Sequence, residues 1–440
     1  MKTVLIFAHE CAPYHRPQST IGAQRPAQFA RHLPAFGWRA IVICCAQGQR
    51  ESLDRKDLAR VRYATQEALA QAETDTSLII PTPSLIHDGW LDRAWRATLL
   101  VRGLRRAPLR KLLTAVKFAT GDWSQSWQPC AQTAADVVAE QVKIDVCLAE
   151  HSPDASFFLA RWFKKKYGVP WLADLRDPVL RPFQGATRRV YARVARHLVA
   201  GAAGTIAVTP VWAEMDAQLF GKPSRCISNG YDPTEYAPSA PRRHERLIIG
   251  FAGNIRETFD IFMDGLKLAA ERLPPAERRA LCFRYWGIAH EKVAQKAAQA
   301  GLSDLCEIQP HGPRETVLHA LNETDLLLLL TLPRSSQRDP YLAQGLYPGK
   351  VFEYFGVQRP ILCVPDDGGL LDDLLRRSRT GVAAGTPRAV ADYLLETLRH
   401  WQKGGTIPYQ PDIAVLQSYT RQHLTGQLAQ ALTSAGNLRN

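Results

Sequence analysis

Short runs of apolar and β-branched residues alternate with longer stretches of mixed polarity through almost the whole chain. The short runs have the length of strands, and several of the longer stretches, at 22–34, 133–142, 154–167 and 210–220, carry apolar residues at helical spacing. The pattern predicts thirteen strands. They span 3–8, 39–44, 78–80, 144–148, 170–174, 204–208, 224–227, 247–252, 282–286, 305–308, 325–330, 360–364 and 381–383.

This alternation predicts an α/β protein whose parallel sheets are covered by helices on both faces. Right-handed crossovers make such domains doubly wound and Rossmann-like. A segment rich in proline and charge, 233–243, precedes a new apolar strand, and we expect the linker there. The expected domains are 1–235 and 244–405, facing each other across a cleft at the carboxyl ends of both sheets. We expect 406–440 to form a helix that returns toward the N-terminal domain.

Composition narrows the class of partner. The 440 residues carry a formal charge of +13, which favours nucleic acid, anionic lipid headgroups or phosphorylated small molecules. The nine cysteines include no CxxC pair, as is typical of reduced thiols. The first apolar run is too short for a signal peptide, and no run reaches about 18 apolar residues. We therefore expect a cytoplasmic protein.

Candidate chemistry in the first half gathers at predicted carboxyl ends of strands. Gly22 lets the backbone approach a ligand where a helix begins, and Arg25 adds a positive charge one turn later. His151 follows the strand at 144–148 and titrates near neutrality. Arg176 and Asp177 follow the next strand. Each also has a plain structural explanation as a loop glycine, a surface arginine, a core histidine or a pair of mutually neutralising charges.

The second half contains a more informative segment, 345–355. Pro348 suits the start of a helix, and Gly349 and Lys350 then occupy its first turn. A cation there opposes the helix dipole unless an anion neutralises it. Glu353 lies one turn later on the same face and offers a carboxylate to a ribose diol. The alternative is a surface ion pair between Lys350 and Glu353, worth only tenths of a kcal/mol.

Four segments taken in order, 22–25, 170–178, 229–232 and 348–354, resemble the retaining GT-B glycosyltransferases often called family four. The resemblance spans nearly the whole chain and is greatest for branches that build bacterial surface polysaccharides. It implies a C-terminal domain that binds a nucleotide-diphosphate sugar and an N-terminal domain that binds the acceptor. It implies neither a metal nor a cofactor. The implied donor-binding residues are Gly22, Asn254, Gly349, Lys350 and Glu353, the acceptor-binding residues are Arg25, Arg176 and Asp177, and the catalytic residues are His151, Arg256 and Lys350.

The chain departs from the family pattern at two places. The family has paired glutamates eight positions apart, and the position that pairs with Glu353 is Gly345 here. The family also often has a lysine after the arginine equivalent to Arg256, where this chain continues with 257–260, Glu-Thr-Phe-Asp. The first departure leaves sugar positioning unassigned, and the second leaves the diphosphate clamp incomplete.

An insert at about 90–120 carries eight basic residues and no acidic residue between Arg93 and Lys117, interleaved with leucine, valine and tryptophan. Such a stretch can lie on an anionic membrane, and Pro108 is expected to divide it into two helices. The alternative is a core-packed helix with a solvated basic face. No nucleic-acid-binding module accompanies the charge, so nucleic acid is not an expected partner.

The sequence therefore predicts a glycosyltransferase that moves a sugar from a nucleotide-diphosphate sugar to a lipid-linked or polysaccharide-precursor acceptor, with retention, on the cytoplasmic face of a membrane. Two alternatives stay open. One is a sugar-nucleotide 2-epimerase of the same fold. The other is a catalytically degenerate GT-B protein that serves as a scaffold.

Overall fold

The computed structural model describes residues 1–14, 21–46, 58–72, 76–84, 126–181, 185–236, 244–333 and 340–437. The chain divides into unit 1, Met1–Ser228 with Arg421–Asn440, and unit 2, Asn229–Thr420. The predicted insert at about 90–120 lies outside the described residues.

The two crossings between the units differ from the expected domain ends at 235 and 405. The turn at 229–236 and the segment 406–420 belong to unit 2. The physical reason is local pairing, because the Tyr231 N–H donates to the Tyr419 carbonyl at 3.1 Å and Tyr231 pairs with Thr420 in an isolated parallel bridge. The segment that enters unit 2, at Tyr231, and the segment that leaves it, at Tyr419 and Thr420, are thus hydrogen-bonded to each other within unit 2.

Unit 1 is built on a seven-stranded parallel sheet in the order β3-β2-β1-β4-β5-β6-β7. Every residue of β1 after Lys2 is buried, as expected for a strand covered on both faces. The strands are β1 (Lys2–Phe7), β2 (Trp38–Cys45), β3 (Ser77–Thr82), β4 (Val146–His151), β5 (Trp171–Leu175), β6 (Gly204–Ala207) and β7 (Ser224–Cys226).

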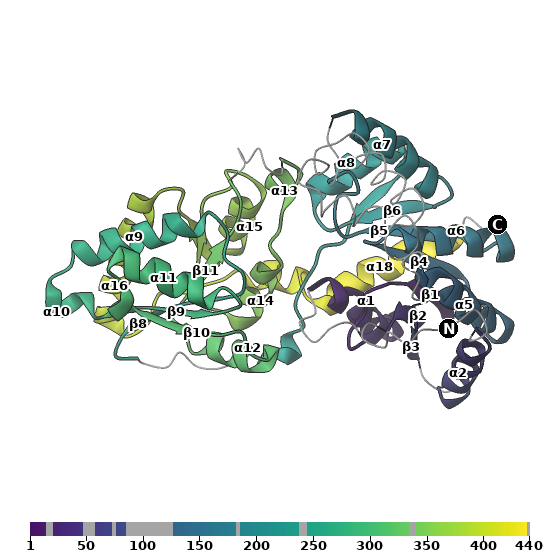
Figure 1. Ribbon diagram of the computed structural model, residues 1–440, viewed down its shortest axis with the longest axis horizontal. Coiled ribbons are helices and arrows are strands. Elements are labelled where there is room, and N and C mark those ends of the chain that lie inside the picture. Colours follow the sequence, from purple (N-terminus) through teal and green to yellow (C-terminus); the bar gives the residue numbers. More distant parts are fainter. Residues whose placement is uncertain are drawn as a thin grey trace, which may run out of the picture. The chain divides into compact units, whose positions relative to one another are not determined.

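Helices cover both faces of this sheet. Alternate β1 residues, Leu5 and Phe7 against Val4 and Ile6, enter two separate cores. Figure 1 shows α18, in yellow, beside α1, and its apolar side chains share the second core with α1. The helices are α1 (Ile21–His32), the 3-10 helix η1 (Leu33–Phe36), α2 (Leu58–Gln71), α5 (Gln128–Gln141), α6 (Ala155–Tyr167), α7 (Gly185–Val199), α8 (Pro210–Phe220) and α18 (Arg421–Gly436).

Unit 2 repeats the plan with six parallel strands in the order β10-β9-β8-β11-β12-β13. The five leucines of β11 are all buried. The strands are β8 (Leu247–Ala252), β9 (Leu281–Trp286), β10 (Cys306–Gln309), β11 (Leu326–Leu330), β12 (Ile361–Val364) and β13 (Gly381–Ala383). With the seven of unit 1, all thirteen predicted strands are present, and the prediction of two Rossmann-like parallel sheets is confirmed.

The helices of unit 2 also form two layers. Figure 1 shows α9, α11 and α16 together, and their apolar residues share one core, whereas α12, α14, α15 and α17 share the other. The helices are η5 (Pro233–Glu235), α9 (Phe259–Glu271), α10 (Pro275–Arg278), α11 (His290–Ala300), η6 (Ser303–Leu305), α12 (Arg314–Asn322), α13 (Pro340–Gly345), α14 (Gly349–Val357), α15 (Leu370–Ser378), α16 (Pro387–Gly404) and α17 (Ile413–Ser418).

Strand order locates the places where ligands are expected. In both sheets the first strand, β1 or β8, lies between strands whose connections run in opposite directions. Parallel α/β sheets bind ligands outside the carboxyl ends of the strands at this point. The relevant edges are therefore the ends of β1 and β4 in unit 1 and the ends of β8 and β11 in unit 2. Over the described part of the chain, no helix has the length and apolarity needed to cross a bilayer.

Candidate functional site

Arg25 is buried completely beneath the carboxyl edge of the unit 1 sheet. Its Nε and Nη2 donate to the two carboxylate oxygens of Asp174 at 2.8 and 2.9 Å, and its Nη1 and Nη2 donate to the carbonyls of Ser228 and Ile227, both at 2.9 Å. The guanidinium also lies over the Phe29 ring, 4.7 Å from its centroid. These contacts make Arg25 a buried structural clamp and not a surface arginine, and its contact with the acceptor stays a prediction.

Gly22 and Arg176 meet at the same edge. A Cβ atom on Gly22 would lie 1.9 Å from Arg176 Nη1, so the glycine makes room for the guanidinium. Arg176 Nη1 donates to Glu150 Oε1 at 3.2 Å, Nη2 donates to Glu10 Oε2 at 3.4 Å, and Nε lies 3.8 Å from Asp177 Oδ2. Gly22, predicted as a donor-binding glycine, therefore serves an internal contact in unit 1.

Glu150 is a buried carboxyl in this cluster, and its Oε2 has no hydrogen-bond partner in the described part of the chain. Burial raises the pKa of Glu150 to about 8. Arg176 and Arg25 oppose that shift in its pKa, whereas Asp174 and Glu10 add to it. The group is thus held largely as the neutral acid at pH 7, which lowers the cost of keeping it out of water.

His151 ends β4 with its ring stacked on Phe157, at 5.3 Å between centroids and an interplanar angle of 13°. Its Nε2 lies 3.0 Å from Asp154 Oδ1, and the Tyr191 hydroxyl donates to the other oxygen of Asp154. The His151 side chain is 9% exposed. The His151 ring therefore stacks on Phe157 beside a buried carboxylate, which sequence reasoning did not single out, although Asp154 stands only three residues away.

The carboxyl edge of unit 2 is built differently. Gly253 follows β8 with φ of 127°, a left-handed conformation that favours glycine. A Cβ atom there would lie 2.6 Å from both Cε and Nζ of Lys350. The Lys350 ammonium therefore rests over the Gly253 backbone, and glycine is required both by the backbone and by the lysine. The structure thus brings the loop after β8 together with the first turn of α14.

Helix α14 is anchored to the sheet and open at its start. The Tyr354 hydroxyl donates to the Leu328 carbonyl of β11 at 2.9 Å, which fixes the helix against the strand. Pro348 stands at the N-cap and makes no side-chain hydrogen bond to the helix. Gly349 and Lys350 follow at the amino end, where free N–H groups and the helix dipole attract anions.

Lys350 is half-buried, and within the ranges that the structure describes no carboxylate lies in ion-pair range of it. The alternative of an ion pair between Lys350 and Glu353 is therefore not what the structure shows. Glu353 lies instead 3.5 Å from Arg314 Nη2. An unneutralised cation at a helix amino terminus, on a glycine platform, is a suitable place for a diphosphate.

The loop after β8 carries Asn254, which was predicted to bind the donor, and Arg256, which was predicted to be catalytic. Asn254 and Arg256 are both exposed, and the Arg256 carbonyl accepts a hydrogen bond from the Phe259 N–H at the start of α9. Tyr285 stiffens this loop, because its hydroxyl donates to the Gly253 carbonyl at 2.7 Å. Nothing along the chain marks Tyr285 for this role beyond its place in a strand.

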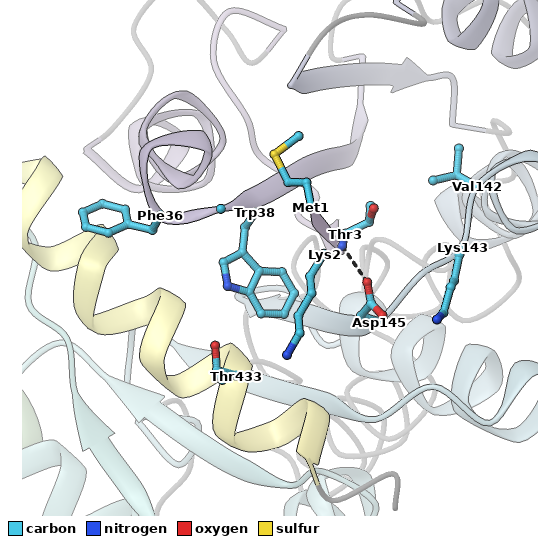
Figure 2. Close-up of a pocket in the computed structure, with 10 residues that line it drawn as sticks. Met1, Lys2, Thr3, Phe36, Trp38, Val142, Lys143, Asp145 and Thr433 are labelled. Carbon is cyan, nitrogen blue, oxygen red and sulfur yellow. Dashed lines mark hydrogen bonds between the residues drawn. The ribbon is translucent and has the colours of Figure 1, made fainter.

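A cavity of about 680 Å³ lies elsewhere, at the amino ends of the strands of unit 1. Figure 2 shows its lining, with the Thr3 N–H donating to Asp145 Oδ2 at 2.7 Å. Its other lining residues include Lys2, Lys143 and Trp38. Because ligands of parallel sheets bind at the opposite edge, this cavity is not the candidate donor site.

The strand orders, the two parallel sheets and the helix layers are those of the GT-B fold. HepE from Anabaena, solved with UDP and glucose, aligns with 99% of this chain and 100% of its own at a TM-score of 0.56 and 15% identity. A glycosyltransferase from Rickettsia africae aligns over 99% and 98% at a TM-score of 0.56 and 10% identity. Sucrose-phosphate synthase from Thermosynechococcus elongatus aligns over 100% and 97% at a TM-score of 0.54 and 12% identity.

No protein-family model matches the chain, and no curated protein sequence matches it.

Proposed function

We propose that this protein is a glycosyltransferase that uses a nucleotide-diphosphate sugar as donor. The observation that carries the proposal is the Lys350 ammonium over Gly253, at the open amino end of α14, with Glu353 one turn further along the same helix. Lys350 supplies charge for the diphosphate, and Glu353 supplies a carboxylate for the ribose diol. Both groups lie in unit 2 at the carboxyl edge of its sheet.

Departure of a diphosphate is the step that these residues would assist. The bond between the sugar carbon and the phosphate oxygen breaks, and the acceptor hydroxyl oxygen forms the new bond to that carbon. The hydroxyl proton passes to a leaving phosphate oxygen, and negative charge develops on the departing diphosphate. Lys350 and the first N–H groups of α14 stabilise that charge without reorganising, and electrostatic stabilisation of this kind commonly contributes most to catalysis. Arg256, on the exposed loop after β8, is proposed as a second cation for the same phosphates.

The donor is proposed to be a UDP-sugar. HepE was solved with UDP and with UDP-glucose, and its fold is the one found here. The reaction is proposed to proceed with retention and without a metal, following the family resemblance.

Unit 1 is proposed to hold the acceptor, a lipid-linked or polysaccharide precursor. Arg176 and Asp177 remain partly exposed at its carboxyl edge, so they are the residues proposed to meet the acceptor, whereas Arg25 is buried. His151 is proposed to face the reacting sugar. Contact of 93–117 with an anionic membrane on the cytoplasmic side is part of the same proposal and is tested by co-sedimentation with anionic against neutral vesicles at low salt.

The first experiment is a thermal-shift screen of UDP-, GDP-, dTDP- and ADP-sugars against the full chain, Lys350→Gln, Glu353→Gln and a matched control, Glu396→Gln. Glu396 is exposed on α16 and takes no part in the site. We expect a rise in Tm for UDP-sugars that both site variants lose and the control keeps. Absence of any shift at millimolar nucleotide sugar would overturn the proposal.

A further inference from the structure

Arg314 joins two carboxylates, one of which is Glu353. Arg314 is the first residue of α12, its Nη1 lies 2.9 Å from Glu235 Oε2, and its Nη2 lies 3.5 Å from Glu353 Oε1. The three residues belong to η5, α12 and α14, so the guanidinium ties together three segments of unit 2 that are distant in sequence. Neither contact was signalled by spacing along the chain.

Packing fixes the segments that carry these charges. A Cβ atom on Gly356 would lie 2.5 Å from the ring of Tyr236, so the residue that follows η5 rests directly on α14. Helices α12 and α14 share one apolar core, in which Leu318 and Leu321 pack with Val351. Glu235 and Arg314 are therefore presented to Glu353 by a rigid frame, and only the side-chain torsions are left to set.

The charge of Arg314 favours a Glu353 carboxylate that is held in one position. Burial lowers the pKa of Arg314, but the carboxylates of Glu353 and Glu235 raise that pKa, and the net shift is upward. The guanidinium is therefore charged at every pH of interest. The Glu353 side chain is 20% exposed, so its carboxylate is restrained on one side and reachable on the other. A planar guanidinium is suited to this task because its donors have fixed directions.

We propose that Arg314, braced by Glu235, is a positioning residue that orients the Glu353 carboxylate toward the two ribose hydroxyls of the donor nucleotide; this inference rests on the proposed function. A carboxylate binds a diol well only when both hydroxyls find an oxygen at hydrogen-bond distance. Without Arg314, Glu353 keeps its charge but loses the contact that holds its rotamer. Its selectivity for the diol then falls, while the diphosphate contacts remain.

The test compares the affinity of UDP with that of 2′,3′-dideoxyuridine diphosphate, measured by calorimetry on the full chain. The variants are Arg314→Gln, Arg314→Lys and Glu235→Gln, with Arg388→Gln as the matched control. Arg388 is an exposed arginine of α16 that pairs only weakly with Asp392, at 3.9 Å. We expect the unsubstituted chain and the control to prefer UDP by about tenfold, which corresponds to about 1.4 kcal/mol.

In Arg314→Gln the preference is expected to fall below about twofold by loss of UDP affinity alone, with the dideoxy nucleotide bound as before, because the diol then meets a carboxylate that is no longer held in place. Arg314→Lys should keep part of the preference, and Glu235→Gln should lose part of it. An exposed ion pair with only a structural role would leave the preference unchanged, and that result would overturn the inference. If Arg314→Gln does not fold, the preference for UDP measured in Glu235→Gln tests the inference, and an unchanged preference would overturn it. If the unsubstituted chain binds neither nucleotide, the proposed function itself fails.

Discussion

The carboxyl edges of the two sheets both carry charged groups but use them in opposite ways. In unit 1, Arg25 is buried with Asp174, and Arg176 is shared between Glu10 and Glu150. In unit 2, Lys350 lies half-buried at a helix amino terminus with no carboxylate beside it in the described ranges. Removing one member of a buried, mutually neutralised pair destabilises a fold, whereas a cation left without a partner at a ligand edge is available to a substrate.

The largest expected effect on stability comes from Arg25, in the neutralised cluster of unit 1. Arg25→Met leaves Asp174 buried without its partner and two carbonyls without donors. We expect the free energy of unfolding to fall by about 3–5 kcal/mol. Urea denaturation monitored by circular dichroism measures it, with Arg388→Met as the control. A loss below about 1 kcal/mol would show that water or a neighbouring group replaces the guanidinium.

Glu150→Gln tests the buried acid by pH. The pKa of Glu150 is raised to about 8 in the folded chain, above its value of about 4.5 when unfolded. Its contribution to stability is therefore complete below pH 4.5 and is lost as pH rises through 8. The stability of Glu150→Gln relative to the unsubstituted chain should rise between about pH 5 and pH 9 by on the order of 2–4 kcal/mol.

Urea midpoints measured at several pH values follow this difference, with Glu396→Gln as the control. Parallel pH profiles for Glu150→Gln and the unsubstituted chain would contradict the raised pKa.

Gly22→Ala probes the close approach of Arg176. The added methyl group overlaps Nη1 in the present geometry, so the guanidinium must move away from Glu150 and Glu10. We expect a loss of about 1–2 kcal/mol in stability. In an Arg176→Ala background the same substitution should cost close to nothing, because the overlapping group is gone. Equal costs in the two backgrounds would place the strain elsewhere.

Lys350→Gln should have the smallest effect on stability, and it should stabilise the chain, whereas Arg25→Met and Gly22→Ala destabilise it. Removing a cation from the first turn of α14 relieves its repulsion with the helix dipole, so the free energy of unfolding should rise by about 0.3–1 kcal/mol. Calorimetry with UDP should show at least about a tenfold loss of affinity, about 1.4 kcal/mol, for the same variant. A loss of stability above about 1 kcal/mol would instead give Lys350 a structural role like that of Arg25.

The sequence predicted the strands because their apolar runs are short, have the length of strands and alternate with helix-length segments. It also located Lys350 and Glu353, since a glycine-rich loop before a helix is a local signal. It could not distinguish Arg25 from a surface arginine, because Asp174, its charged partner, stands 149 positions away. The sequence did not predict the contacts of Arg314 with Glu235 and Glu353 for the same reason, because they depend on how three segments pack.

The path of the chain has a consequence for the order of folding. Unit 2 is one continuous segment, whereas unit 1 needs α18, whose Leu424, Leu428 and Leu432 fill the core beside α1. During synthesis from the amino terminus, unit 2 begins after unit 1. Unit 2 is nevertheless the first unit to have all its residues synthesised, because unit 1 still lacks α18. Until α18 arrives, unit 1 exposes an apolar face of its sheet. A ribosome stalled once residue 420 has left its exit tunnel should therefore hold a folded unit 2 and a unit 1 that recruits chaperones.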